Sequence, residues 1–172
     1  MSDPSSNFTY SPNVANRLVP ATNILASLSN HVTRIVVGVA IFHPTNPDQV
    51  LIVQRTDAEE HFPSQFELPG GHMEPTDATV LHAVVRETQE ETGLKVTKIT
   101  TEFEPFEYQT QTEPVAQTIT TLQLNFRVQV YPGPIKLNPD EHQSYAWVAL
   151  DDIDRYRMSP TMAQVVRNAL AY

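Results

Sequence analysis

The sequence contains no cysteine. That absence excludes a disulfide framework, a metal site built on thiolates and a thiol nucleophile. Long apolar runs are also missing, because no stretch approaches the roughly 20 apolar residues that span a bilayer. The first 30 residues hold one arginine, Arg17, and one acid, Asp3, and show no signal or transit pattern. We therefore expect an intracellular protein without a membrane partner, cytoplasmic, with nuclear and organellar locations left open.

Basic residues are few. The 11 Lys and Arg residues against 20 Asp and Glu residues give a net charge of −9. A strongly acidic chain is a poor general binder of nucleic acid, because basic patches supply most of the non-specific affinity. We therefore expect no nucleic-acid partner. A small phosphorylated substrate is compatible with this charge, provided that metal ions offset the repulsion locally.

The chain is organised around the stretch from Leu68 to Leu94, LPGGHMEPTDATVLHAVVRETQEETGL. Asp77 is expected to be the N-cap of a helix, because its side-chain oxygens can accept from the first unpaired backbone N–H groups. Residues Ala78 to Thr92 contain neither Gly nor Pro. Gly93 is expected to end the helix, as glycine often does.

An α-helix turns by about 100° per residue, and this turn sorts the side chains of the expected helix onto different faces. The face expected to meet the core carries five residues: Val80, Leu81, Val84, Val85 and Thr88. Glu87, Glu90 and Glu91 stand at i, i+3 and i+4, so they are neighbours on another face. That face lies beside the core face, with Glu91 at the seam.

Three adjacent carboxylates repel one another at neutral pH, and their place in the C-terminal half of the helix adds an unfavourable macrodipole. A divalent cation would reverse this cost, because carboxylate oxygens are preferred ligands of magnesium and manganese. The alternative is a solvated acidic helix face, since such charge runs are common on protein surfaces.

The same stretch resembles the signature of the Nudix hydrolase family of MutT-like proteins, G-x5-E-x7-R-E-U-x-E-E-x-G-U, in which U is aliphatic. Gly71 begins the match, and the second half is filled without a gap by Arg86, Glu87, Glu90, Glu91, Gly93 and Leu94. Asp77 stands in place of the first glutamate, one residue is inserted between Asp77 and Arg86, and Thr88 replaces an aliphatic residue. A loop at the helix start can absorb the insertion.

The resemblance implies an α/β protein, a Nudix-type α/β/α sandwich with a mixed central β-sheet. Residues 31–172 would form this domain after an N-terminal extension of residues 1–30. That extension is either a flap over the substrate pocket or a packed or frayed segment. In the second case Val19, Ile24, Leu25 and Leu28 would dock on the core.

The resemblance also implies a metal site and a catalytic group. The expected metal ligands are the Gly71 carbonyl and the carboxylates of Glu87, Glu90, Glu91 and Glu141, with Mg²⁺ as cofactor and Mn²⁺ also accepted. Arg86 is expected to hold a carboxylate by charge-assisted hydrogen bonds. The general base is expected to be a glutamate, with Glu90 preferred over Glu141.

Four further residues are implied as substrate contacts: Arg55, Phe66, His72 and Tyr108. Each has a structural alternative, namely a surface charge for Arg55, a polar loop side chain for His72 and core packing for the aromatic residues. Phe62 and Tyr145 are further candidates for stacking on a base.

Alternation and β-branched residues predict the remaining elements. The expected strands are Val32–Phe42, Val50–Gln54, Leu94–Tyr108, Ala116–Tyr131 and Tyr145–Leu150. Pro105 is expected to interrupt the third of them, and a bulge is expected near Thr120 and Thr121 in the fourth. A polar turn is expected from Gln109 to Pro114, and a last helix after Ser159-Pro160.

The function that follows is metal-dependent hydrolysis of a diphosphate linkage in a nucleoside diphosphate derivative or related nucleotide. The alternative is a Nudix-like nucleotide-binding or regulatory module without turnover. A small phosphorylated molecule is the expected partner, and a homodimer is compatible with the sequence.

Overall fold

The computed structural model describes residues 8–28, 31–112 and 117–171. Within these ranges the strands are β1 (Thr9–Tyr10), β2 (Val32–His43), β3 (Asn46–Arg55), β4 (Phe66–Glu67), β5 (Gly70–His72), β6 (Val96–Thr112), β7 (Gln117–Val130) and β8 (His142–Val148). The helices are α1 (Ala21–Ser27), α2 (Val80–Thr92) and α3 (Pro160–Ala171), with 3-10 helices η1 (Pro12–Arg17) and η2 (Leu150–Arg155). None of the helices in these ranges is long and apolar enough to cross a membrane.

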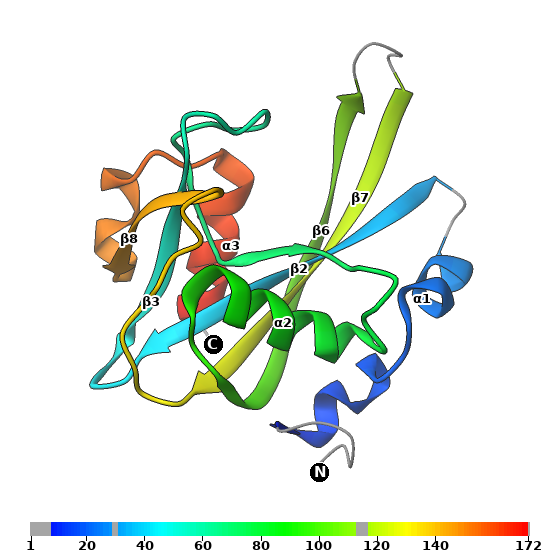
Figure 1. Cartoon of the computed structure of the whole chain (residues 1–172), viewed down its shortest axis with the longest axis horizontal. Coiled ribbons are helices and arrows are strands. Elements are labelled where there is room, and N and C mark those ends of the chain that lie inside the picture. The colour runs from blue at the N-terminus through cyan, green and yellow to red at the C-terminus, as the bar shows by residue number, and fades with distance from the viewer. Residues whose placement is uncertain (1–7, 29–30, 113–116, 172) are drawn as a thin grey trace.

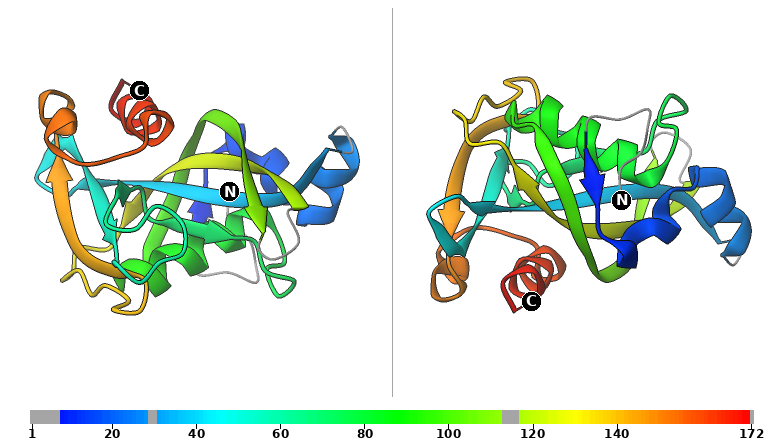
Figure 2. Two further views of the ribbon diagram at one scale, coloured as in Figure 1. Left: turned by 90° about the horizontal axis from the view of Figure 1, so that it is seen from above. Right: turned by 90° about the horizontal axis from the view of Figure 1, so that it is seen from below.

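The strands form one mixed sheet in the order β1-β6-β7-β2-β3-β4, with β5 paired to β2 and β8 paired to β3. β2 and β7 run parallel, as do β1 and β6, whereas the other pairs are antiparallel. Helix α2 covers one face of the sheet and α3 covers the other, as the green and red helices show (Figure 1, Figure 2). The predicted α/β/α sandwich with a mixed sheet is therefore confirmed.

Two apolar cores hold these layers together. The first lies between α2 and the sheet and includes Leu81 and Val84 of α2, with Val37 of β2 and Phe126 of β7. The second lies between α3 and the other face of the sheet, around Val166 and residues of β3. Because apolar burial is the main favourable term in folding, the first core fixes α2 against the sheet and the second fixes α3.

Helix α2 begins later than predicted. It starts at Val80 with Thr79 as N-cap, and Gly93 ends it in the left-handed conformation, with φ 69°. The predicted N-cap Asp77 is wrong, because its carboxylate instead accepts a hydrogen bond from the Glu74 backbone N–H at 2.8 Å and pairs with Arg86.

The predicted faces of α2 are largely those observed. Val80, Leu81, Val84 and Thr88 are buried, while Val85 is half-buried. The buried face also includes Glu87 and Glu91. These two carboxylates therefore lie at the boundary between core and solvent, where the sheet edge approaches the helix.

The N-terminal segment packs on the first core. β1 pairs with β6, and Val14 and Ile24 are buried, with Val19, Leu25 and Leu28 half-buried against the same core. The backbone N–H of Val80, the first residue of α2, donates to the carbonyl of Val19 at 3.0 Å. No residue of the described range 8–28 lines the cavity at the glutamates.

Three strand predictions need correction or refinement. The polar turn expected from Gln109 is wrong within the described residues, because Gln109–Thr112 continue β6 and pair with β7, whereas residues 113 and 114 lie outside them. Threonine-rich segments suit a strand, and this hairpin extends beyond the rest of the sheet (Figure 1). The irregularity near Thr120 and Thr121 exists, but the extra residue is Thr33 on β2. Pro105 does not end β6 and only shifts its register.

Candidate functional site

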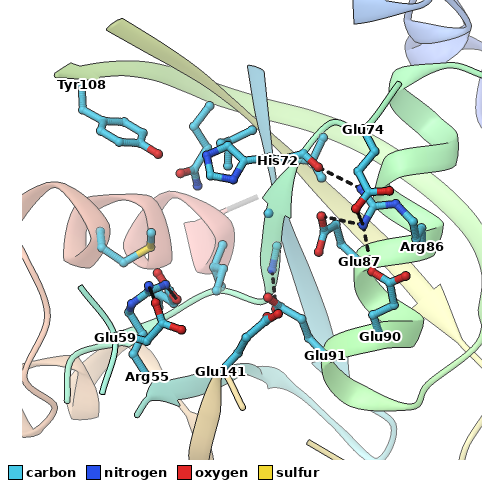
Figure 3. Close-up of a pocket in the computed structure, with 18 residues that line it drawn as sticks. Arg55, Glu59, His72, Glu74, Arg86, Glu87, Glu90, Glu91, Tyr108 and Glu141 are labelled. Carbon is cyan, nitrogen blue, oxygen red and sulfur yellow. Dashed lines mark hydrogen bonds and ion pairs between the residues drawn. The ribbon is translucent and has the colours of Figure 1, made fainter. Parts of the chain in front are cut away.

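The glutamates of α2 face a cavity of about 390 Å³ at the edge of the sheet (Figure 3). Glu87 and Glu91 are buried, at 6% and 3% exposure, whereas Glu90 is exposed at the rim. The charged residues that line the cavity are Arg55, Glu59, Glu67, Glu74, Arg86, Glu87, Glu90, Glu91 and Glu141. Seven glutamates thus face two arginines, so the cavity is strongly negative.

Burial dominates the electrostatics of the two inner carboxylates. It raises the pKa of Glu87 to about 7, although the charge of Arg86 opposes the shift. Burial likewise raises the pKa of Glu91 well above its usual range, against the hydrogen bond that its Oε2 accepts from the Gly70 N–H at 2.7 Å. In both cases desolvation disfavours the ionised carboxylate and outweighs the contact that favours it.

Arg86 connects the loop before α2 to the helix. Its Nε and Nη2 donate to the two oxygens of Asp77 at 3.0 and 2.9 Å, and Nη2 also donates to the His72 carbonyl at 2.8 Å. Its Nη1 pairs with Glu87 at 2.9 Å and with Glu90 at 2.8 Å. The planar guanidinium can make these bonds at once, so it fixes both carboxylates relative to the loop.

The glycine turn lets the sheet approach the helix closely. Gly70 has φ 151°, a conformation that side chains rarely adopt. A Cβ on Gly71 would lie 2.6 Å from Oε1 of Glu87. β5 pairs with β2 through Val37↔Gly71, which holds the Gly71 backbone beside this carboxylate. The turn therefore needs glycine because the Glu87 side chain occupies the adjacent space.

Two residues from the β8 region complete the acidic site. Ligand atoms of Glu91, Glu141 and His142 all lie within 4.8 Å of one another. Pairing of β8 with β3, in which Arg55 is opposite His142, brings this segment to the end of α2. His142 is buried, and its Nδ1 has no hydrogen-bond partner. Its Nε2 lies 3.5 Å from Oε1 of Glu67, another acid that lines the cavity.

The donor set fits a divalent cation. Carboxylate oxygens of Glu91 and Glu141 are the ligands that Mg²⁺ prefers, and the His142 imidazole would admit a softer cation such as Mn²⁺. A cation bound there would favour the ionised forms of Glu87 and Glu91 and so oppose the rise in pKa that burial causes.

The four predicted substrate contacts lie around the cavity and an adjoining pocket. Arg55 pairs with Glu59, and with Glu67 at 2.8 Å, so its charge is already partly satisfied. Burial and the neighbouring Arg34 lower the pKa of His72. Burial also raises the pKa of Tyr108. Phe66 packs edge-on against Tyr156 with ring centroids 5.0 Å apart, so part of its role is structural.

The adjoining pocket has a volume of about 300 Å³ and an aromatic wall. Phe62, Phe66, Phe106 and Tyr108 line it, together with Arg34 and Gln123. Tyr145, the other candidate for stacking on a base, is absent from the residues that line this pocket and is half exposed in a groove with Trp147.

Sequence reasoning missed Glu59, Glu67 and His142. Glu67 pairs with β3 through Val53, and His142 pairs with it through Arg55. Their convergence depends on strand pairing between segments far apart in the sequence, and neither residue has local ligand spacing. An acid three residues before the glycine pair, Glu67 before Gly70, is the one signal that could have drawn attention.

Comparisons with known proteins bear on the family and the fold of this chain. A family model described as the NUDIX domain matches residues 33–169. Nucleoside triphosphatase NudI of Escherichia coli is 29% identical over 126 residues, which are 71% of this chain and 88% of that protein. The asymmetrical bis(5'-nucleosyl)-tetraphosphatase of Rattus norvegicus is 30% identical over 104 residues, 60% of this chain and 66% of that protein.

Solved structures share the fold. The MutT NUDIX hydrolase of Burkholderia pseudomallei superposes with a TM-score of 0.63 at 22% identity, over 78% of this chain and 96% of that one. At this identity the similarity shows the architecture alone.

Proposed function

Because this chain belongs to the NUDIX domain family, we propose that it hydrolyses a diphosphate linkage in a nucleoside diphosphate derivative or related nucleotide, assisted by a divalent cation. The predicted family and enzyme class are confirmed: the chain is a Nudix hydrolase, a pyrophosphohydrolase acting on phosphorus anhydrides. The relatives named for nucleoside triphosphates and for a dinucleoside tetraphosphate make these two classes the first substrates to test.

The observation that carries the proposal is the excess of carboxylates in the cavity. Seven glutamates against two arginines would repel a polyphosphate. A substrate of that charge can enter only if cations offset the field locally. A metal-dependent phosphoryl site meets this condition, whereas a metal-free anion site does not.

Glu91, Glu141 and His142 are our candidates to hold the cation, with Glu87 and the Gly71 carbonyl beside them. The cation would neutralise phosphate charge and lower the pKa of an attacking water. Arg86 would keep Glu87 and Glu90 oriented, because its guanidinium bonds both carboxylates and the loop. Arg55 would reach a phosphate by exchanging one of its two glutamate partners.

The proton acceptor is chosen between Glu90 and Glu141. The sequence favours Glu90, but its carboxylate is already paired with Arg86 at 2.8 Å. Within the described residues, the Glu141 side chain has no ion pair, and it lies next to Glu91 (Figure 3). We therefore place Glu141 ahead of Glu90 as the group that takes the proton from water.

The test is hydrolysis of a nucleotide panel with Mg²⁺ and with Mn²⁺. The panel contains nucleoside triphosphates, dinucleoside polyphosphates and nucleoside diphosphate derivatives. We expect turnover that a chelator abolishes. Glu91→Gln should lower kcat by orders of magnitude while the circular dichroism spectrum stays unchanged, because it removes one negative ligand from a buried site. Undiminished hydrolysis of every accepted substrate by this variant would refute the proposal.

A further inference from the structure

Two amide side chains lie on the sheet face that meets the aromatic pocket. Gln123 and Asn125 of β7 are buried, at 5% and 0% exposure. Burying amides is costly unless their polar atoms are hydrogen-bonded, so the orientation of each amide is constrained.

The orientation of both amides follows from one backbone group. Asn125 Nδ2 donates to the Glu104 carbonyl at 2.7 Å, and a carbonyl oxygen can only accept. Asn125 must therefore turn its Oδ1 toward Gln123, whose Nε2 donates to it at 2.9 Å. Gln123 Oε1 is left over as an acceptor, with no donor to it from the described residues.

The surrounding backbone is shaped for this pair. Phe103 is opposite Asn125 and Phe106 is opposite Gln123, so Glu104 and Pro105 both stand opposite Leu124. This irregularity turns the Glu104 carbonyl toward Asn125. A Cβ on Gly38 would lie 2.5 Å from Asn125 Oδ1 and 2.6 Å from Gln123 Nε2, so glycine leaves room for both amides.

A purely structural role explains Asn125 and the amide nitrogen of Gln123, but not the amide oxygen of Gln123. Asn125 satisfies the Glu104 carbonyl, and Gln123 Nε2 satisfies Asn125 Oδ1. Gln123 lines both the glutamate cavity and the aromatic pocket. Gln123 therefore borders the space where a ligand would sit, and Oε1 is the amide atom of Gln123 that no described residue engages.

We propose that Gln123 determines base specificity: its Oε1 accepts a hydrogen bond from the exocyclic amino group of the substrate's base. This proposal rests on the proposed function, because it assigns the aromatic pocket to the base of the nucleotide. Phe66, Phe106 and Tyr108 line that pocket and offer faces or edges to a planar ring. A fixed acceptor discriminates strongly, because a base without the donor leaves it buried and unpaired.

The experiment compares matched nucleotides that differ by one amino group: adenine against purine, guanine against hypoxanthine, and cytosine against 2-pyrimidinone. We expect kcat/KM to favour the amino form of the preferred base by about 10-fold to 100-fold. Gln123→Leu should bring this ratio close to one. Gln123→Glu, which keeps an oxygen acceptor, should retain a preference, whereas a merely structural role would make both variants alike.

Gln129→Leu is the matched control, because Gln129 lies on the same strand, is exposed and lines neither pocket. It should leave the ratio unchanged. A wild-type ratio near one for every accepted base would overturn the proposal, as would an unchanged ratio in Gln123→Leu. A further outcome is that the protein instead distinguishes ribonucleotides from 2′-deoxyribonucleotides in a way that depends on Gln123. That result would show that Gln123 Oε1 contacts the sugar, and it would overturn the proposal too.

Binding of the corresponding nucleoside monophosphates, measured by calorimetry, separates the two proposals. If the wild-type protein binds these monophosphates without preferring the amino form, or does not bind them at all, the role of Gln123 is refuted. An amino preference in binding without hydrolysis of any nucleotide refutes the proposed function and leaves the role of Gln123 standing.

Discussion

The protonation of Glu87 predicts an unusual pH dependence of stability in the metal-free protein. Burial raises its pKa from 4.5 to about 7 in the folded state. A group whose folded pKa lies above its unfolded pKa stabilises the fold fully below the unfolded value. That contribution is lost as the pH rises through the folded value. The free energy of unfolding should therefore fall between about pH 5 and pH 7.

The magnitude follows from the size of the shift. Moving the pKa from 4.5 to about 7 corresponds to about 3 kcal/mol. This is an upper bound, because water that enters the cavity screens the charge. Glu91 also makes the free energy of unfolding fall as the pH rises, since burial raises its pKa too. His72 makes the free energy of unfolding rise with pH below neutral pH, because its pKa is lowered.

The assay is urea unfolding with a chelator present at pH 5, 6, 7 and 8, for wild type and Glu87→Gln. The difference between the two proteins isolates the contribution of Glu87. Glu90→Gln serves as control, because the Glu90 side chain is 54% exposed on the same helix. In a second series with Mg²⁺ in place of the chelator, the ion should stabilise the wild type more at pH 8 than at pH 5, since it binds the ionised form. Equal pH slopes in wild type and Glu87→Gln would refute this reasoning.

Three further predictions concern the supports of the site. Arg86→Lys should reduce metal affinity or turnover by about 10-fold to 100-fold, measured by metal titration, because lysine cannot bond both oxygens of Asp77; an unchanged titration would contradict it. Gly71→Ala should reduce kcat more than thermal stability, because its Cβ would displace the Glu87 carboxylate; normal turnover would count against the close approach. Val14→Ala should cost about 2 kcal/mol in urea unfolding, because Val14 is the buried residue of η1. A loss below about 0.5 kcal/mol would show that the segment adds little.

The features of α2 that depend on nearby residues alone could be predicted from the sequence. The spacing of Glu87, Glu90 and Glu91 predicted a face beside the core face, with Glu91 at the seam. Glu91 is buried there, and Glu87 is buried as well. Gly93 ends the helix as expected, because only a residue without Cβ adopts its conformation at no steric cost.

The features that could not be predicted depend on contacts between residues far apart in the sequence. Asp77 could have capped the helix, but the guanidinium of Arg86, nine residues later, bonds both of its oxygens. His142 joins Glu91 through the pairing of β8 with β3, which no local pattern encodes. The orientation of Gln123 depends on a register shift in β6, a strand whose polar end resembled a turn.

The hydrogen bond from Val80 to Val19 ties the helix that carries the glutamates to a segment outside the family match. A shortened protein starting at residue 33 would retain each side chain around the cavity, yet it would lack the carbonyl that receives the first amide of α2. Its helix would then fray from the end opposite Glu91, and Asp77 and Arg86 would loosen before the acids did. Activity lost on trimming would thus reflect a lost anchor for the helix, with the chemical groups themselves still present.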